Sequence, residues 1–246
     1  MKKCNLFFVL IFIFQCTISL QAQTDSAHLA KLYIASISGA CPPTQSKIVN
    51  TLVSIRPENK NLVHKTIEGE DYILALSLKN DTTYYQNNKS TGKYNTGNYR
   101  LWVTAAPELK KKFSMMGVKD TSLRLKQLLG LPPTSTYRYF IEFWVRPQDL
   151  FRPCPDKEIS DGSCDLCFPE KTDSTYINWI NESRINRYYN CKPYDNYPWT
   201  QLGYTYDWNP QNKSHIGLSE FVVDVNKYII VNRIYTVQEY LRKPKK

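Results

Sequence analysis

The chain has 246 residues, of which 42% are hydrophobic, 22% charged and 13% aromatic. This composition excludes a disordered or collagen-like chain and supplies enough apolar side chains for a large core. The length, with no Gly/Ser-rich or Pro-rich linker in the middle, predicts one domain rather than two. The formal net charge is +10, but two lysines at the N-terminus and four basic residues in the tail 242–246 supply much of it. The folded part carries about +4, so we expect no nucleic-acid partner.

Residues 1–22 have the pattern of a secretory signal peptide. Two lysines precede an apolar run from Leu6 to Phe14, and a cleavage region ending at Ala22 follows. The rival interpretation is an uncleaved membrane anchor, but the run is shorter than the roughly 20 residues that span a bilayer. We therefore predict a mature chain that begins at Gln23, a secreted or periplasmic location, and no membrane span.

The first half of the predicted domain, 23–241, alternates helices with strands. Asp25 can cap a helix that ends at Ile37, because an aspartate side chain accepts hydrogen bonds from the first turn. Asp120 can cap a later helix in the same way. Propensity, turn and cap signals predict strands at 48–55, 72–79 and 99–104, a long polar loop at 80–98, and helices from Pro107 and over 122–129.

The segment 137–146 has the clearest strand pattern in the chain. Its alternation places one apolar set on the face that we expect in the core: Tyr139, Ile141, Phe143 and Val145. The other face is aromatic and charged, which suits a groove or a half-covered sheet.

The second half of the domain completes the fold. We predict a helix at 175–188, strands at 200–208, 218–224 and 228–235, and a short helix capped by Thr236. The last two strands are expected to form a hairpin around residues 226–227. This order lacks the regular spacing of parallel βαβ units. It predicts an α+β fold with a mainly antiparallel sheet, several short helices and a cysteine-stapled loop at 147–169.

Cys4 and Cys16 leave with the signal peptide, so five of the seven cysteines remain. An oxidising compartment favours disulfides, with one thiol left over. We predict that Cys154 pairs with one of three other cysteines: Cys164, Cys167 and Cys191. The rival is a four-thiolate zinc site, which the spacing of Cys164 and Cys167 permits. The acidic residues of the same loop lack the spacing of a calcium-binding loop, so we expect no metal and no cofactor.

Arginine and aromatic side chains mark a candidate binding surface. Arg146 and Arg152 follow the strand 137–146 beside Trp144, and arginine captures phosphate or carboxylate groups while aromatic rings stack on planar ligands. Three further aromatic residues, Tyr204, Tyr206 and Trp208, are predicted to share one face of their strand.

Glu220 lies inside an otherwise apolar strand, so it should be either paired or functional. We expect Glu220 to converge with Arg146 and Arg152 on one side of the sheet. A purely structural ion pair is the alternative.

Motifs of the common enzyme classes are missing. The sequence has no Gly-x-Ser-x-Gly elbow, no metalloprotease helix motif and no Gly-rich phosphate loop. The mature histidines His64 and His215 have no nucleophile motif beside them. Whether the chain is an enzyme stays open at this point.

The segments 125–133, 143–147, 202–208 and 218–221 resemble a family of secreted proteins typical of Bacteroidota, to which no activity is attached. The chain also resembles NAD-consuming toxin domains, which are NAD glycohydrolases. The matching features are Leu131-Pro132-Pro133, a strand that ends at Val145-Arg146-Pro147, and a polar residue in the segment 217–221. This second resemblance implies Arg146 or Arg152 on a pyrophosphate and Glu220 beside an oxocarbenium-like ribose.

The sequence favours a secreted or periplasmic binding module. Its partner would be a small anionic or ring-bearing ligand, or a protein, held on a surface built from Trp144, Tyr204, Tyr206 and Trp208. The alternative is an NAD glycohydrolase-like enzyme on the same surface, with Glu220, Arg146 and Arg152 as its catalytic residues.

Overall fold

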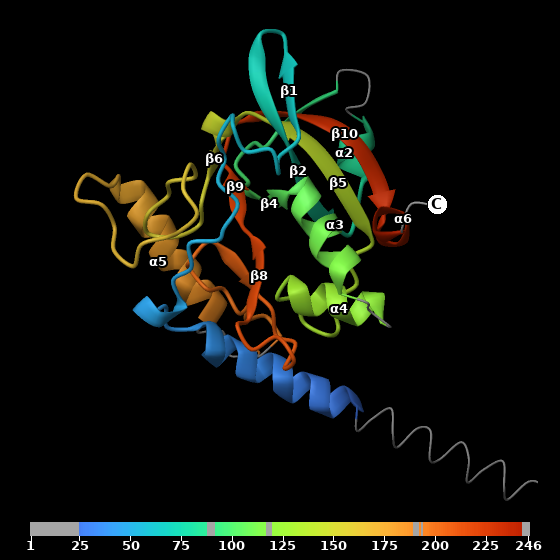
Figure 1. Cartoon of the computed structure of the whole chain (residues 1–246), viewed down its shortest axis with the longest axis vertical. Helices are drawn as coiled ribbons and strands as arrows, with labels where there is room; N and C mark the ends of the chain where they lie inside the picture. The colour runs from blue at the N-terminus through green and yellow to red at the C-terminus, as the bar shows by residue number, and fades with distance from the viewer. Residues whose placement is uncertain (1–24, 88–91, 117–119, 189–191, 193, 243–246) are drawn as a thin grey trace, which may run out of the picture.

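The computed structural model describes residues 25–87, 92–116, 120–188, 192 and 194–242. It shows the predicted α+β fold, built on an antiparallel sheet of eight strands (Figure 1). These strands are β1 (His64–Ile67), β2 (Glu70–Lys79), β3 (Lys93–Asn95), β4 (Leu101–Ala105), β5 (Tyr139–Val145), β6 (Leu150–Phe151), β9 (Phe221–Val223) and β10 (Tyr228–Thr236). Their order is β3-β10-β5-β2-β4-β9-β6, and β1 pairs with β2. A separate two-stranded sheet contains β7 (Tyr204–Tyr206) and β8 (Ile216–Ser219).

Helices cover the sheet and close its ends. They are a helix over residues 25–40, α2 (Thr83–Asn87), α3 (Ala106–Met115), α4 (Thr121–Leu128), α5 (Ser174–Tyr188) and α6 (Val237–Leu241), with short 3-10 turns η1 (Gln45–Lys47) and η2 (Pro147–Asp149). In Figure 1, α5 lies on the opposite side of the molecule from α6, and the helix 25–40 runs below β8 and α4.

Both faces of the central strand β5 are buried. Ile141 and Phe143 belong to the core on one face, whereas Phe140 and Trp144 pack on the other face with Leu109 of α3. Side chains of α3, α4 and α6 therefore cover much of the face that was expected to be a groove or half-covered. The alternation predicted for the segment 137–146 is confirmed, since Ile141 and Phe143 share one face. Burial of both faces is typical of a central strand.

Several predicted helix ends are confirmed in detail. The Asp120 side chain accepts a hydrogen bond from the Leu123 amide at 3.0 Å. Thr236 and Glu239 form a capping box at the start of α6. The first helix packs Tyr33 and Ile37 on Trp208, as its apolar face predicts.

Several predicted segments differ from the structure. Residues 48–55 form no strand, because Leu52 and Ile55 donate instead to carbonyl groups of the cysteine loop. The strands β9 and β10 form no hairpin with each other: β9 pairs with β4 and β6, and β10 pairs with β3 and β5. The polar segment 80–98 contains α2 and β3, and the short strand β1 has no counterpart among the predicted elements.

The sheet opens between β2 and β4. These strands pair only at Ala75 with Ala105 and at Leu76 with Thr104. Beyond this point the Ser77 hydroxyl, rather than a backbone amide, donates to the Trp102 carbonyl at 2.9 Å. We call this opening the fork; the candidate site lies beside it.

The cysteine loop contains one of the predicted bonds. Cys154 is joined to Cys164, with a Cα–Cα distance of 6.4 Å. This bond excludes a four-thiolate zinc site, and the part of the chain that the structure describes holds no cluster of three or more His, Cys, Asp or Glu side chains suited to a metal. The predicted bonding of Cys167 is not seen, since its thiol and that of Cys41 are free, and Cys191 lies outside the described residues.

No helix within the described ranges is long and apolar enough to cross a bilayer.

We predict that loss of the Cys154–Cys164 bond destabilises the domain. The double variant Cys154→Ala/Cys164→Ala should lower the free energy of unfolding by about 2–4 kcal/mol, because the unfolded chain gains freedom and two buried side chains shrink. Urea denaturation measures the difference. Cys167→Ala is the control, because Cys167 is exposed and unbonded. Equal stability of the double variant and the wild type would contradict the prediction.

Candidate functional site

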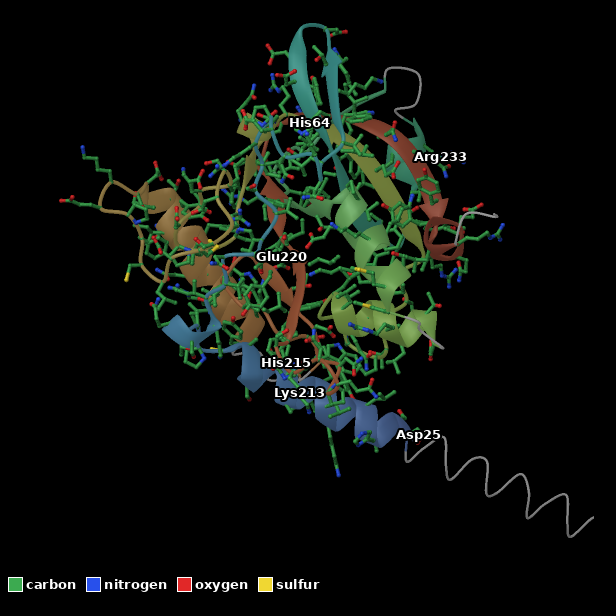
Figure 2. All side chains as sticks on the ribbon, viewed as in Figure 1. Asp25, His64, Lys213, His215, Glu220 and Arg233 are labelled. Carbon is green, nitrogen blue, oxygen red and sulfur yellow. A yellow bond between two sulfur atoms is a disulfide. The ribbon has the colours of Figure 1, made fainter. Side chains whose placement is uncertain are left out.

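Glu220 joins β8 to β9 and is held by its backbone. Its amide donates to the Gly203 carbonyl at 2.8 Å. The next residue, Phe221, pairs with Val103 and enters the main core, so alternation directs Glu220 away from that core. The preceding residue is fixed by α3, because the Ser219 amide donates to both carboxylate oxygens of Glu108 at 3.0–3.1 Å. Figure 2 places Glu220 near the middle of the molecule, whereas His64, Lys213 and Arg233 lie at its periphery.

A cavity of about 380 Å³ lies next to Glu220. Its walls come from both strands at the fork, from the segment after α4, from the end of α5 and from the segment 197–199 that leads to β7. Tyr206 also lines it, and it is the one member of the predicted aromatic set that does. The size lies at the lower end of the usual range for small-molecule sites, roughly 300–1,000 Å³. We call this cavity the fork pocket.

The most unusual side chain in the fork pocket is Arg187, from the last turn of α5. Its guanidinium carbon lies 4.5 Å from the ring centroid of Trp102 and 5.6 Å from those of Tyr197 and Trp199. We call these four residues the arginine box. Within the described residues, the guanidinium has no hydrogen-bond or ion-pair partner. Burial lowers the pKa of Arg187, and the nearby Glu220 carboxylate opposes that shift.

Glu220 is equally short of partners. Its Oε2 atom is buried and makes no hydrogen bond to any described residue, although part of the residue remains accessible to solvent. Burial raises the pKa of Glu220 from 4.5 to about 7, and the positive charge of Arg187 acts in the opposite direction. The Nε1 atom of Trp199 is also buried without a partner. The fork pocket thus contains a guanidinium, a carboxyl group and an indole N–H whose hydrogen-bonding capacity is unused by the described chain.

Further polar groups complete the walls. Burial raises the pKa of the Tyr137 hydroxyl, and the neighbouring Tyr197 acts in the same direction, so Tyr137 extends the arginine box. Lys79 lines the pocket, and burial lowers the pKa of its ammonium group to about 8. Arg100 also contributes, but Asp224 pairs with it at 2.9 Å. Glu220 is the one carboxyl group among the lining residues, so the pocket is rich in positive charge.

The structure does not bring the two predicted arginines to Glu220. Arg146 forms an ion pair with Asp149 at 2.8 Å, and neither residue lines the fork pocket. Arg152 is fully buried on the other side of β9, 5.1 Å from the ring centroid of Phe221, and donates to backbone carbonyl groups such as those of Val53 and Asp161. The expected convergence is replaced by that of Glu220 with Arg187.

The predicted aromatic face is divided among several parts of the fold. Trp144 packs in the core and donates from Nε1 to Asn232 at 3.0 Å. Tyr204 donates to the Lys47 carbonyl at 3.0 Å, and Trp208 donates to the Leu131 carbonyl at 2.9 Å. Only Tyr206 belongs to the pocket, so these rings do not form one ligand-binding surface.

Sequence reasoning missed Arg187 and the rings around it. A usable signal existed, because Arg187 is seven residues after the buried Ile180, which places both on one face of α5. An arginine on the buried face of a helix needs an acceptor, a ring or a ligand.

The chain matches no known protein family, no curated protein and no solved structure. The geometry of the site is therefore the basis for a functional proposal.

We predict that Glu220→Gln stabilises the protein at alkaline pH. The folded state raises the pKa of Glu220 to about 7, so the free energy of unfolding falls as the pH rises from 4.5 through 7. An amide has no charge to desolvate. The variant should match the wild type at pH 5 and gain up to about 3 kcal/mol at pH 8.

Urea denaturation at the two pH values tests this. Glu182→Gln, at an exposed position of α5, is the matched control and should show no such gain. A variant less stable than the wild type at pH 8 would show instead that ionised Glu220 and Arg187 form a stabilising pair.

Proposed function

We propose that the chain binds a small anionic ligand with a planar or apolar part in the fork pocket. The observation that carries the proposal is the Arg187 guanidinium, which lies among three aromatic rings at the pocket wall and has no acceptor among the described residues. Arginine donates to carboxylate, sulfonate or phosphate groups through two parallel hydrogen bonds. The rings hold the guanidinium in place, so little side-chain entropy is lost when an anion binds.

The unused indole N–H supports the same assignment. Trp199 Nε1 is a donor and cannot accept, so only an acceptor can satisfy it. An anion beside Arg187 supplies acceptor atoms in a site where water is partly excluded and electrostatic attraction is strong. A neutral apolar ligand would leave both groups unsatisfied.

Glu220 makes this binding depend on pH. Below about pH 7 its carboxyl group is mostly neutral, so Arg187 keeps a free positive charge and the carboxyl O–H can donate to the ligand. Above about pH 7 the carboxylate attracts Arg187 and repels an incoming anion. Anion affinity should therefore fall as the pH rises.

We predict that benzenesulfonate binds to the wild-type protein about tenfold more tightly at pH 6 than at pH 8. This ratio is expected if the ligand binds only when Glu220, with a pKa of about 7, is protonated. The charge of a sulfonate does not change in this range. Isothermal titration calorimetry gives both dissociation constants. Arg187→Gln should abolish binding. Glu220→Gln should remove most of the pH dependence and leave the smaller part that comes from Lys79, whose pKa of about 8 lies at the upper end of this range.

Lys213→Gln is the control for net charge, because this exposed lysine lies outside the pocket (Figure 2). Melting curves establish that each variant is folded. No heat of binding at either pH, or binding that Arg187→Gln leaves intact, would refute the proposed function.

A second candidate function is hydrolysis of the glycosidic bond of NAD. The observation that favours it is the single carboxyl group, Glu220, among the described lining residues of the fork pocket. Water would add to the ribose carbon, nicotinamide would leave, and a proton would be released. Ionised Glu220 could stabilise the positive charge that develops on the ribose. Leu131, from the resemblance to NAD glycohydrolases, lines the fork pocket, and Arg187 takes the pyrophosphate role that the resemblance gave to Arg146 or Arg152.

If the second candidate holds, we expect nicotinamide to be released faster at pH 8 than at pH 6. The reaction needs the ionised form of Glu220, whereas anion binding is favoured by its neutral form. Chromatography of the products after incubation with NAD measures the rate. Glu220→Gln is the control for contaminating activity. A rate that is zero, or unchanged in the variant, leaves the binding function alone.

We also propose that the protein is exported, as the sequence 1–22 predicts, and that it belongs to the secreted Bacteroidota family that it resembles. The Cys154–Cys164 disulfide supports export, because such bonds persist in oxidising compartments.

A further inference from the structure

A second cavity, of about 540 Å³, adjoins the fork pocket. The two share three wall residues, namely Leu78, Leu131 and Tyr137. We call the second one the side pocket. Leu78 and Tyr137 contribute to the walls of both pockets from β2 and from the segment before β5.

The side pocket has the charge that an anion needs. Two cationic residues, Lys126 and Arg138, line it, and the described residues of its walls include no Asp or Glu. Lys126 donates to the Pro133 carbonyl at 2.7 Å, whereas Arg138 is exposed and makes no ion pair with a described residue. The carboxylates at the starts of α4 and α6, Asp120 and Glu239, are already hydrogen-bonded as helix caps.

Two further groups in the side pocket can donate to an anion. The Ser135 hydroxyl oxygen is buried and has no partner among the described residues. Thr121 and Ser122 place the first turn of α4, an eight-residue helix, at the pocket wall, where backbone amides and the helix dipole favour negative charge. The cations and the unused hydroxyl point to a polar, negatively charged group rather than to an apolar one.

Tyr137 is the residue that both pockets use. It neighbours Tyr197 of the arginine box, and 36% of the residue is exposed. Because Tyr137 lines both pockets, a ligand that extends from Arg187 along Tyr137 would be directed toward the side pocket.

We propose that the fork pocket and the side pocket form one elongated site for a ligand with two anionic groups, one on Arg187 and the other on Arg138 and Lys126. This inference rests on the proposed function, because it needs an anion on Arg187. It adds the class of ligand: an extended molecule with negative charge at two separated positions and a planar or apolar part against the aromatic side chains between them.

The test uses linear alkanes that carry a sulfonate at both ends, from ethane to decane, with methanesulfonate as the single-anion probe. Two linked anions bind more tightly than one only when the linker spans both subsites. Affinity measured by calorimetry at pH 6 should pass through a maximum with chain length. The best disulfonate should bind roughly ten- to a hundredfold more tightly than methanesulfonate.

Variants assign the two ends. Arg138→Gln and Lys126→Gln should each weaken the best disulfonate at least threefold and leave methanesulfonate unchanged. Arg187→Gln should weaken both probes, and Lys213→Gln should weaken neither. Arg138 is exposed, so its replacement leaves the core intact, and melting curves check each variant.

The possible failures are distinct. If methanesulfonate binds through Arg187 but no disulfonate binds more tightly, or if Arg138→Gln and Lys126→Gln have no effect, the elongated site is refuted and the proposed function stands. If neither methanesulfonate nor benzenesulfonate binds to the wild type, the proposed function itself fails.

Discussion

The irregular half of this fold depends on the buried guanidinium of Arg152. This group donates to the carbonyl groups of Val53, Glu158, Ile159 and Asp161, and so joins the segment 48–55 to the cysteine loop where no ladder of strands does so. Gly203 packs directly on it: a Cβ atom at that position would lie 2.5 Å from Arg152 Cδ. Because the Gly203 carbonyl accepts from the Glu220 amide, the position of Glu220 is set in part by Arg152, although the two side chains face opposite sides of β9.

Arg152 and Arg187 illustrate different solutions to one physical problem. Burial removes the hydration of a guanidinium, and that loss must be offset. At Arg152 the backbone supplies carbonyl acceptors to Nε and Nη2, and only Nη1 is left without a partner among the described residues. At Arg187 only aromatic faces surround the charge, and these stabilise it without satisfying its N–H groups. Two of the buried side-chain atoms that have no hydrogen-bond partner among the described residues, Glu220 Oε2 and Trp199 Nε1, belong to residues that line the fork pocket with Arg187.

The regular part of the fold could be predicted from the sequence because local signals agree with tertiary structure there. The cap at Asp120, the capping box at Thr236 and the alternation of β5 each act over a few residues. Segment 48–55 has the composition of a strand, but its partners are loop carbonyl groups and a serine side chain, and no local pattern encodes them. The course of β10, which passes β9 to pair with β5, is likewise decided by long-range packing.

The candidate site was predicted only in part, for a related reason. Glu220 was identified because a carboxyl group in an apolar strand is conspicuous in a sequence. Its partner could not be found by proximity along the chain, since Arg187 comes from a helix that ends before the strand β7 begins. The rings of Trp102 and Trp199 likewise come from two separate segments, and only the folded chain brings them to Arg187.

The close contact between the first helix and β7 links residues 25–40 to the candidate site. Gly39 lies so near Tyr206 that a Cβ atom there would be 2.5 Å from the tyrosine hydroxyl oxygen, and Tyr206 forms part of the fork pocket wall. Trp208 packs on Tyr33 of the same helix with the rings edge-on. A shortened form that starts after residue 40 would thus lose the contacts that hold Tyr206 and Trp208. The smallest unit that keeps the fork pocket intact therefore begins at the helix 25–40 rather than at the first strand.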